Sequence, residues 1–225
     1  MEEINMAAVE STFSREVEVE SVNVVLKINQ CEVGDVGCVV WDAGLVLAKY
    51  LDYLNMTSNN EYPLLLGKNV IDIGSGTGLV GLVAACIGGN VILTDLPELL
   101  PLLEINIEEN KHHFLGSVKA DVLKWGETNS NFSQPDLLLV GDCIYYEKSL
   151  KPLVNTLSML SDSNTEILLS YEERSFHNSN LLQTEFFDTI KETFVIENIP
   201  ISEMHPDFHS SDIFILKIKK KGREN

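Results

Sequence analysis

The sequence lacks the features that mark several large classes of protein. No apolar run reaches the roughly 18 residues that a membrane-spanning helix needs. The first ten residues are acidic and contain no apolar segment of the kind found in secretory signal peptides. The four cysteines are scattered, without a C-x-x-C pair. We therefore expect reduced thiols in a cytoplasmic protein and no metal site.

Basic residues are also scarce. The chain has 16 Lys and Arg against 34 Asp and Glu, which gives a net charge of −18. Nucleic-acid binding depends on neutralising phosphates, so this balance argues against a nucleic-acid partner. It favours cationic ligands and basic protein segments through long-range attraction, although solubility alone would also explain so acidic a composition.

The length of 225 residues and the hydrophobic content of 44% predict one domain with a substantial core. We expect residues 1–14 to be disordered and residues 15–225 to form that domain. Apolar residues recur at mostly two-residue spacing from Arg15 to Ile28. This pattern predicts one or two antiparallel strands ahead of the main sheet.

The rest of the chain is organised around residues 69–95. A short apolar run leads into a turn with Gly74, Gly76 and Gly78, and an apolar stretch of helical length follows. A second β-rich run then ends at Asp95. This order predicts two parallel strands joined by a right-handed helical crossover. The turn falls at the carboxyl end of the first strand, where open α/β sheets bind ligands.

The spacing of this unit predicts a nucleoside site. Asp95 ends the second strand, where a carboxylate can accept hydrogen bonds from both hydroxyls of a ribose. The dinucleotide pattern G-x-G-x-x-G fails at Leu79, and no G-K-[ST] follows to make a P-loop. The pattern D-x-G-x-G-x-G instead resembles that of methyltransferases that bind S-adenosylmethionine. A purely structural glycine turn is the alternative.

Strand and helix patterns continue to alternate after this unit. Helices are expected at 42–54, with Asp42 as the cap, and at 96–111, 148–160 and 181–193. Strands are expected at 118–120, 137–140 and 165–170. The last two strands, 195–199 and 213–218, have no helix between them and should pair antiparallel. The basic residues from Lys217 onward indicate that the final strand lies at a sheet edge.

Six segments in this order and spacing carry a more specific resemblance: VVWDAGLVLAKYL, IDIGSGTGLVG, LTD, VLKWGE, GDCIYYEKSL and YEERS. From about residue 36 to its end, the chain resembles the methyltransferase-like family of protein-lysine methyltransferases. The resemblance implies a Rossmann-like, seven-strand class I fold of the α/β type, here with an N-terminal β-extension. It also implies S-adenosylmethionine as cofactor and a protein substrate, an AAA ATPase resembling valosin-containing protein.

The resemblance assigns cofactor roles to residues at the ends of the strands. Asp95 would hold the ribose hydroxyls, Asp72 would lie near the cationic amine, and Trp125 would pack on the adenine. The remaining residues implied to border the cofactor are Trp41, Gly74, Ser75, Gly76 and Gly141, and many relatives have Ala in place of Gly141. Ordinary core packing is the alternative for both tryptophans.

A D-x-x-Y motif, from Asp142 to Tyr145, follows the apolar run 137–140 and so also emerges at the carboxyl end of the sheet. Asp142 can orient a lysine amine as the catalytic residue, with Tyr145 in support. Tyr146 and Glu172 can meet the substrate. The alternative is that Asp142 caps a helix and the tyrosines are core residues. Cys143 has no histidine placed to activate it, so we expect a buried thiol.

These observations favour a protein-lysine N-methyltransferase. A methyltransferase of another protein residue or of a small molecule is the second possibility, and a non-catalytic methyltransferase-fold interaction module is the third. A nicotinamide oxidoreductase is the fourth, disfavoured by Leu79 and by the lack of a Tyr-x-x-x-Lys pair. The intact glycines, Asp95 and Asp142 argue against a degenerate site. We expect a monomer that binds no membrane.

Overall fold

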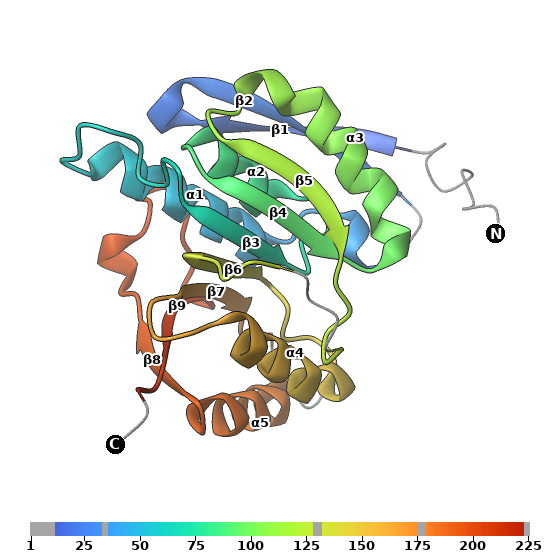
Figure 1. Ribbon diagram of the computed structural model, residues 1–225, viewed down its shortest axis with the longest axis vertical. Coiled ribbons are helices and arrows are strands. Elements are labelled where there is room, and N and C mark those ends of the chain that lie inside the picture. Colours follow the sequence, from blue (N-terminus) through green and yellow to red (C-terminus); the bar gives the residue numbers. More distant parts are fainter. Residues whose placement is uncertain (1–11, 33–35, 128–131, 175–178, 223–225) are drawn as a thin grey trace.

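A computed structural model describes residues 12–32, 36–127, 132–174 and 179–222 (Figure 1). Its centre is a seven-stranded sheet with the strand order β5-β4-β3-β6-β7-β9-β8. Five of these strands are parallel: β3 (Asn69–Ile73), β4 (Asn90–Asp95), β5 (Ser117–Val122), β6 (Leu137–Gly141) and β7 (Glu166–Glu172). The predicted series of parallel strands with helical crossovers is therefore confirmed.

The sheet ends in an antiparallel pair, β8 (Phe194–Asn198) and β9 (Ile213–Lys220). β9 also pairs antiparallel with β7, so the last strand of the chain lies between two others. The expectation that this strand forms a sheet edge is wrong. Its lysines alternate with buried Ile215, Leu216 and Ile218, and Lys217 pairs with Glu166 on β7. The basic side chains thus belong to an inner strand, and the neighbouring strand β7 supplies a carboxylate that pairs with one of them.

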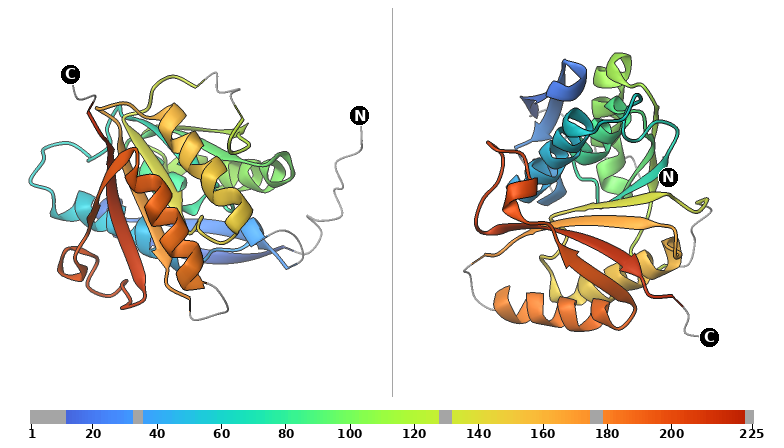
Figure 2. Two further views of the ribbon diagram at one scale, coloured as in Figure 1. Left: turned by 90° about the horizontal axis from the view of Figure 1, so that it is seen from below. Right: turned by 90° about the vertical axis from the view of Figure 1, so that its left-hand side faces the viewer.

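Two helical layers cover the sheet (Figure 2). One face carries α1 (Asp42–Thr57), α2 (Leu79–Cys86) and α3 (Leu100–Asn110), and the other carries α4 (Glu147–Leu160) and α5 (Ser179–Lys191). Successive strand residues face opposite layers, as the two-residue period of a strand requires. On β6, Leu137 and Leu139 join the first core, whereas Leu138 and Val140 join the second.

The N-terminal extension is a separate two-stranded sheet of β1 (Thr12–Val19) and β2 (Val24–Cys31). β1 begins three residues before the expected start, and residues 1–11, on which most of the expected disorder falls, lie outside the described residues. The extension is attached to α3 by two buried side-chain amides. Asn106 and Asn110 bond the backbone of Asn29 and Lys27 at 2.7–3.0 Å. These amides thus satisfy backbone groups that a third strand would otherwise pair.

The helices follow the expected positions with shifted ends. α1 begins at Asp42, so its N-cap is Trp41, and that residue makes no side-chain cap hydrogen bond. The expected capping role of Asp42 is therefore wrong. The helix expected from residue 96 starts as a short 3-10 turn (Pro97–Leu99) before α3, with Pro101 in the first turn of α3. A proline tolerates this position because its missing N–H would have no partner there.

Candidate functional site

The glycine turn connects β3 to α2 at the carboxyl end of the sheet. Gly74 and Gly76 have φ values of +64° and +54°, which residues with a Cβ rarely adopt. A Cβ on Gly76 would lie 2.7 Å from the carbonyl oxygen of Gly37, so only glycine allows the segment before α1 to approach the turn. Ser75 fixes the turn to β4, because Thr94 donates its backbone N–H to Ser75 Oγ at 2.9 Å.

Two carboxylates adjoin the turn. Asp95 accepts hydrogen bonds from the backbone N–H of Gly76 at 2.8 Å and of Leu96 at 2.7 Å. Asp72 is 1% exposed, and its Oδ2 accepts a hydrogen bond from the backbone N–H of Gly81 at 3.0 Å. Burial raises the pKa of Asp72 to about 7; the Gly81 hydrogen bond lowers it and Asp95 adds a further rise. A cation bound beside Asp72 would therefore favour the ionised form of this carboxyl over the protonated form.

Aromatic side chains surround the same turn. Trp125 lies so close to the turn that a Cβ on Gly74 would be 2.8 Å from its ring. The Trp125 ring meets the Tyr145 ring edge-on, with 6.4 Å between the centres. Trp41 is 43% exposed and donates its indole N–H to the carbonyl of Val36 at 2.7 Å. Flat aromatic faces of this kind suit both a nucleobase and a cation.

Asp142 follows β6 and has a left-handed backbone with φ of +57°, which is uncommon for a residue other than glycine. Its N–H donates to the carbonyl of Ser170 at 2.9 Å, which ties it to the neighbouring strand β7. Arg174 donates a hydrogen bond to Asp142 Oδ2. The Oδ1 atom is buried without a hydrogen-bond partner among the described residues. Burial raises the pKa of Asp142, and Arg174 opposes that rise.

Tyr145 and Tyr146 are 37% and 49% exposed, and their rings meet edge-on with 4.7 Å between centres. Neither tyrosine is a core residue, so the alternative that placed both in the core is wrong. Tyr146 also lies beneath the ammonium of Lys148, which is 5.8 Å from the ring centre. Cys143 is 2% exposed, and burial raises its pKa well above the ordinary value, as expected for an inert thiol.

One cavity of about 770 Å³ brings these groups together. Its volume lies within the range of small-molecule and cofactor sites. The predicted site residues that line it are Trp41, Asp72, Gly74, Ser75, Gly76, Asp95, Trp125, Gly141, Asp142, Tyr145 and Tyr146. Glu172 does not line the cavity, but it contacts Arg174, which does. The site thus lies at the carboxyl ends of adjacent strands, the position that the sequence predicted.

Sequence reasoning assigned no role to several groups in the cavity wall. Arg174, Lys124 and Lys148 each bring a cation, and the segment 36–40 brings backbone and apolar side chains. Arg174 stands just after β7, so the rule that ligand-binding residues follow parallel strands could have found it. Segment 36–40 carries no such signal, because it precedes α1 and reaches the glycine turn only through the fold.

The donor set of the cavity fits an adenosine-type cofactor with a cationic amino-acid end. Asp95 brings a carboxylate beside the glycine turn, the type of group that accepts hydrogen bonds from ribose hydroxyls, and Trp125 offers a ring beside the same turn. Among the described residues, no group of three or more His, Cys, Asp or Glu could hold a metal ion. Likewise, no helix in the described ranges is long and apolar enough to cross a membrane.

Comparison with known proteins agrees with this geometry. A sequence profile of the family described as lysine methyltransferase matches residues 20–193. Protein N-lysine methyltransferase METTL21A of Mus musculus is 34% identical over 191 residues, which cover 84% of this chain and 79% of that protein. Protein-lysine methyltransferase METTL21E of Mus musculus is 36% identical over 200 residues, covering 84% and 73%. EEF1A lysine methyltransferase 3 of Xenopus tropicalis is 34% identical over 139 residues, covering 61% and 58%.

Solved structures agree on the fold. The 16S rRNA N2 G1207 methyltransferase of T. Thermophilus, in complex with AdoMet and guanosine, superposes with a TM-score of 0.61 at 16% identity, over 94% of this chain and 51% of that one. A TehB-like SAM-dependent methyltransferase from Corynebacterium glutamicum superposes with a TM-score of 0.54 at 16% identity, over 79% and 98%. The predicted Rossmann-like class I methyltransferase fold is confirmed.

Proposed function

The chain belongs to the lysine methyltransferase family, and from this membership we propose that it transfers a methyl group from S-adenosylmethionine to a lysine side chain of a protein. The observation that supports this most directly is the composition of the cavity. One continuous wall contains both the glycine turn with Asp95 and the D-x-x-Y residues Asp142 and Tyr145. A cofactor-binding half and an acceptor-binding half therefore adjoin.

The cofactor half has a residue for each part of S-adenosylmethionine. Asp95 binds the ribose hydroxyls, Trp125 packs on the adenine, and Asp72 faces the cationic amine. The backbone from Gly74 to Gly76 lies under the methionine and ribose parts, Gly141 lines the methionine end, and Trp41 borders the cofactor. When bound, S-adenosylmethionine supplies a methyl group attached to a positively charged sulfur.

The acceptor half binds the lysine and favours its neutral amine. A lysine amine has a reference pKa near ~10.4, so it arrives charged and must lose a proton before it attacks. Asp142 binds and orients this amine, while Tyr145 and Tyr146 line an aromatic channel that removes water from it. Once this proton has left to solvent, Asp142 would hold the neutral amine with its lone pair facing the methyl group that S-adenosylmethionine supplies, and S-adenosylhomocysteine would be the leaving group. Positioning and electrostatics supply most of the rate enhancement.

As substrate we propose an AAA ATPase resembling valosin-containing protein, methylated by a monomeric enzyme whose residues 15–225 act as one domain. The net charge of −18 supports a lysine in a basic setting, because long-range attraction then favours encounter. Turnover should accordingly fall as salt rises.

The test uses deuterium-labelled S-adenosylmethionine, the purified enzyme, and a panel containing valosin-containing protein and EEF1A. Mass spectrometry should find labelled methyl-lysine on the AAA ATPase. Methylation of EEF1A alone would replace the proposed substrate but keep the activity. Suppose that calorimetry detects cofactor binding but no protein in the panel or in a whole-cell lysate becomes labelled. That result would favour a non-catalytic module instead. Binding of NAD with comparable affinity would overturn the cofactor assignment.

A further inference from the structure

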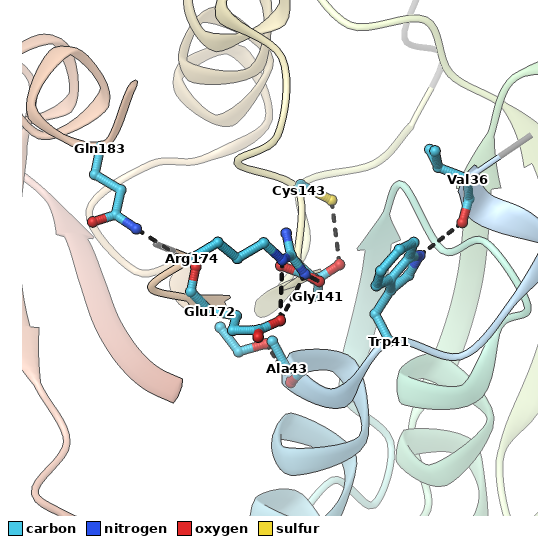
Figure 3. Close-up of polar contacts among 10 residues, drawn as sticks. Val36, Trp41, Ala43, Gly141, Cys143, Glu172, Arg174 and Gln183 are labelled. Carbon is cyan, nitrogen blue, oxygen red and sulfur yellow. Dashed lines mark hydrogen bonds and ion pairs between the residues drawn. The ribbon is translucent and has the colours of Figure 1, made fainter. Parts of the chain in front are cut away.

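The Arg174 side chain lies among groups that would bind a cation. Its guanidinium donates to Asp142 Oδ2, and it contacts Glu172 Oε2 through Nε at 3.0 Å and Nη2 at 2.9 Å (Figure 3). Its Cζ lies 5.2 Å from the centre of the Trp41 ring. Two carboxylates and an aromatic face are also what an alkylammonium ion prefers. Arg174 therefore holds the position that the charged acceptor lysine needs.

The Asp142 carboxylate is covered while this contact lasts. Its side chain is only 4% exposed although the residue lines the cavity, and Oδ1 has no hydrogen-bond partner among the described residues. The Arg174 side chain is 25% exposed and lines the same cavity. A lysine that approaches Asp142 through the cavity must therefore displace the guanidinium.

Glu172 offers the displaced guanidinium a second partner. It contacts Arg174 through two different nitrogens, and its side chain is 29% exposed, so it keeps room to follow a small movement. Asp142, in contrast, is fixed by its backbone hydrogen bond to Ser170. Arg174 can thus leave Asp142 and remain paired, while the Asp142 carboxylate stays in place for the lysine.

We propose that Arg174 is an internal competitor of the acceptor lysine, which covers Asp142 in the substrate-free enzyme and moves onto Glu172 alone when the lysine binds. The inference rests on the proposed function, since it describes how the same site admits its substrate. Arg174 is then a positioning residue, whose charge also affects how tightly the acceptor lysine holds its proton. With Arg174 on Glu172, the lysine faces one unpaired carboxylate; without Arg174, it faces two and holds its proton more tightly.

A binding experiment tests the competition without turnover. The probe is n-butylammonium, a mimic of the lysine side chain, titrated at pH 8 into protein saturated with S-adenosylhomocysteine. The readout is the NMR signal of the Trp41 indole N–H, assigned with Trp41→Phe. Arg174→Gln should bind the probe about tenfold more tightly than the wild type, the scale of one charge-assisted hydrogen bond.

The matched control is Lys119→Gln, which removes one cation from the exposed face of β5, away from the cavity. Its affinity for n-butylammonium should equal that of the wild type, and neutral n-butanol should cause no shift. Equal or weaker probe binding by Arg174→Gln would overturn the proposal. This result is distinguishable from failure of the proposed function, which would show as a wild-type enzyme that methylates no protein lysine.

Kinetics on a confirmed protein substrate supply the second readout. Arg174→Gln should lower KM and kcat together and move the pH of half-maximal kcat upward by about one unit, because the tightly held lysine keeps its proton. Arg174→Lys restores the charge and should return the profile toward the wild type. A raised KM with an unmoved profile would contradict the proposal. The other charged groups lining the cavity, Asp72, Asp95, Lys124 and Lys148, are the same in all these proteins.

Discussion

The buried carboxyl of Asp72 should make cofactor binding depend on pH. Asp72 is 1% exposed, and burial raises its pKa to about 7 in the ligand-free protein. We propose that this carboxylate faces the cationic amine of the cofactor, so a proton must leave Asp72 before the cofactor binds well. Affinity should therefore rise with pH and level off above the pKa.

The magnitude follows from the fraction of Asp72 that is ionised. At pH 5.5, about 1.5 units below the pKa, only ~3% of the molecules carry the anionic carboxylate, against roughly three quarters at pH 7.5. The affinity should therefore increase about 20- to 30-fold over this interval, which corresponds to ~2 kcal/mol.

The effect on stability has the opposite sign. The folded, ligand-free protein binds this proton more tightly than the unfolded chain, in which the carboxyl has the ordinary pKa of 3.8. The contribution to stability is thus present below that value and is lost as pH rises toward about 7.

Calorimetric titration with S-adenosylhomocysteine, which carries the same amine, measures this dependence between pH 5.5 and 7.5. Asp72→Asn is the matched control, because it keeps the shape and cannot ionise. It should bind more weakly than the wild type at pH 7.5 and show no rise with pH. A wild-type affinity that stays constant over the interval, or an equal rise in Asp72→Asn, would show that ionisation of Asp72 does not control cofactor binding.

Three further changes have defined outcomes. Asp142→Asn should lower kcat on a protein substrate by ~10²-fold or more, the scale of one positioned electrostatic group, with little change in calorimetric cofactor affinity; near-normal turnover would remove Asp142 from catalysis. Asp95→Ala should weaken S-adenosylhomocysteine binding by roughly 1.5–3 kcal/mol in the same titration, and an unchanged affinity would contradict the ribose role. Asn106→Leu removes the side-chain amide that pairs buried backbone groups of β2 and of the glycine turn. It should therefore lower the free energy of unfolding, measured in urea, by about 3 kcal/mol. Asn155 is exposed, so the control Asn155→Leu should change this free energy little.

Local patterns predicted the parallel core of the sheet because each strand and helix carries its own signal. The apolar run 137–140 is flanked by turn residues, and Leu150, Leu153, Val154 and Leu157 recur at helical spacing, so both elements follow from nearest neighbours in the chain. The carboxyl ends of parallel strands share one edge, and this rule brought Asp72, Asp95 and Asp142 into one predicted site.

Contacts between distant segments could not be predicted in the same way. Asn106 and Asn110 occur on a helix that reads as amphipathic, and their burial depends on a strand about 80 residues earlier. The order β7-β9-β8 likewise depends on the last strand entering between two others, which composition does not encode. Arg174 shows the same limit at the site, since its pairing with Asp142 joins two strand ends 32 residues apart.

Methyl transfer to a protein lysine is the activity that we propose for this cavity. The most direct test is mass spectrometry of valosin-containing protein after incubation with the enzyme and deuterium-labelled S-adenosylmethionine, with Asp142→Asn enzyme in parallel. We expect labelled methyl-lysine with the wild type and a loss of ~10²-fold or more in its rate of formation with Asp142→Asn. Label on a residue other than lysine, or equal labelling by both enzymes, would contradict it.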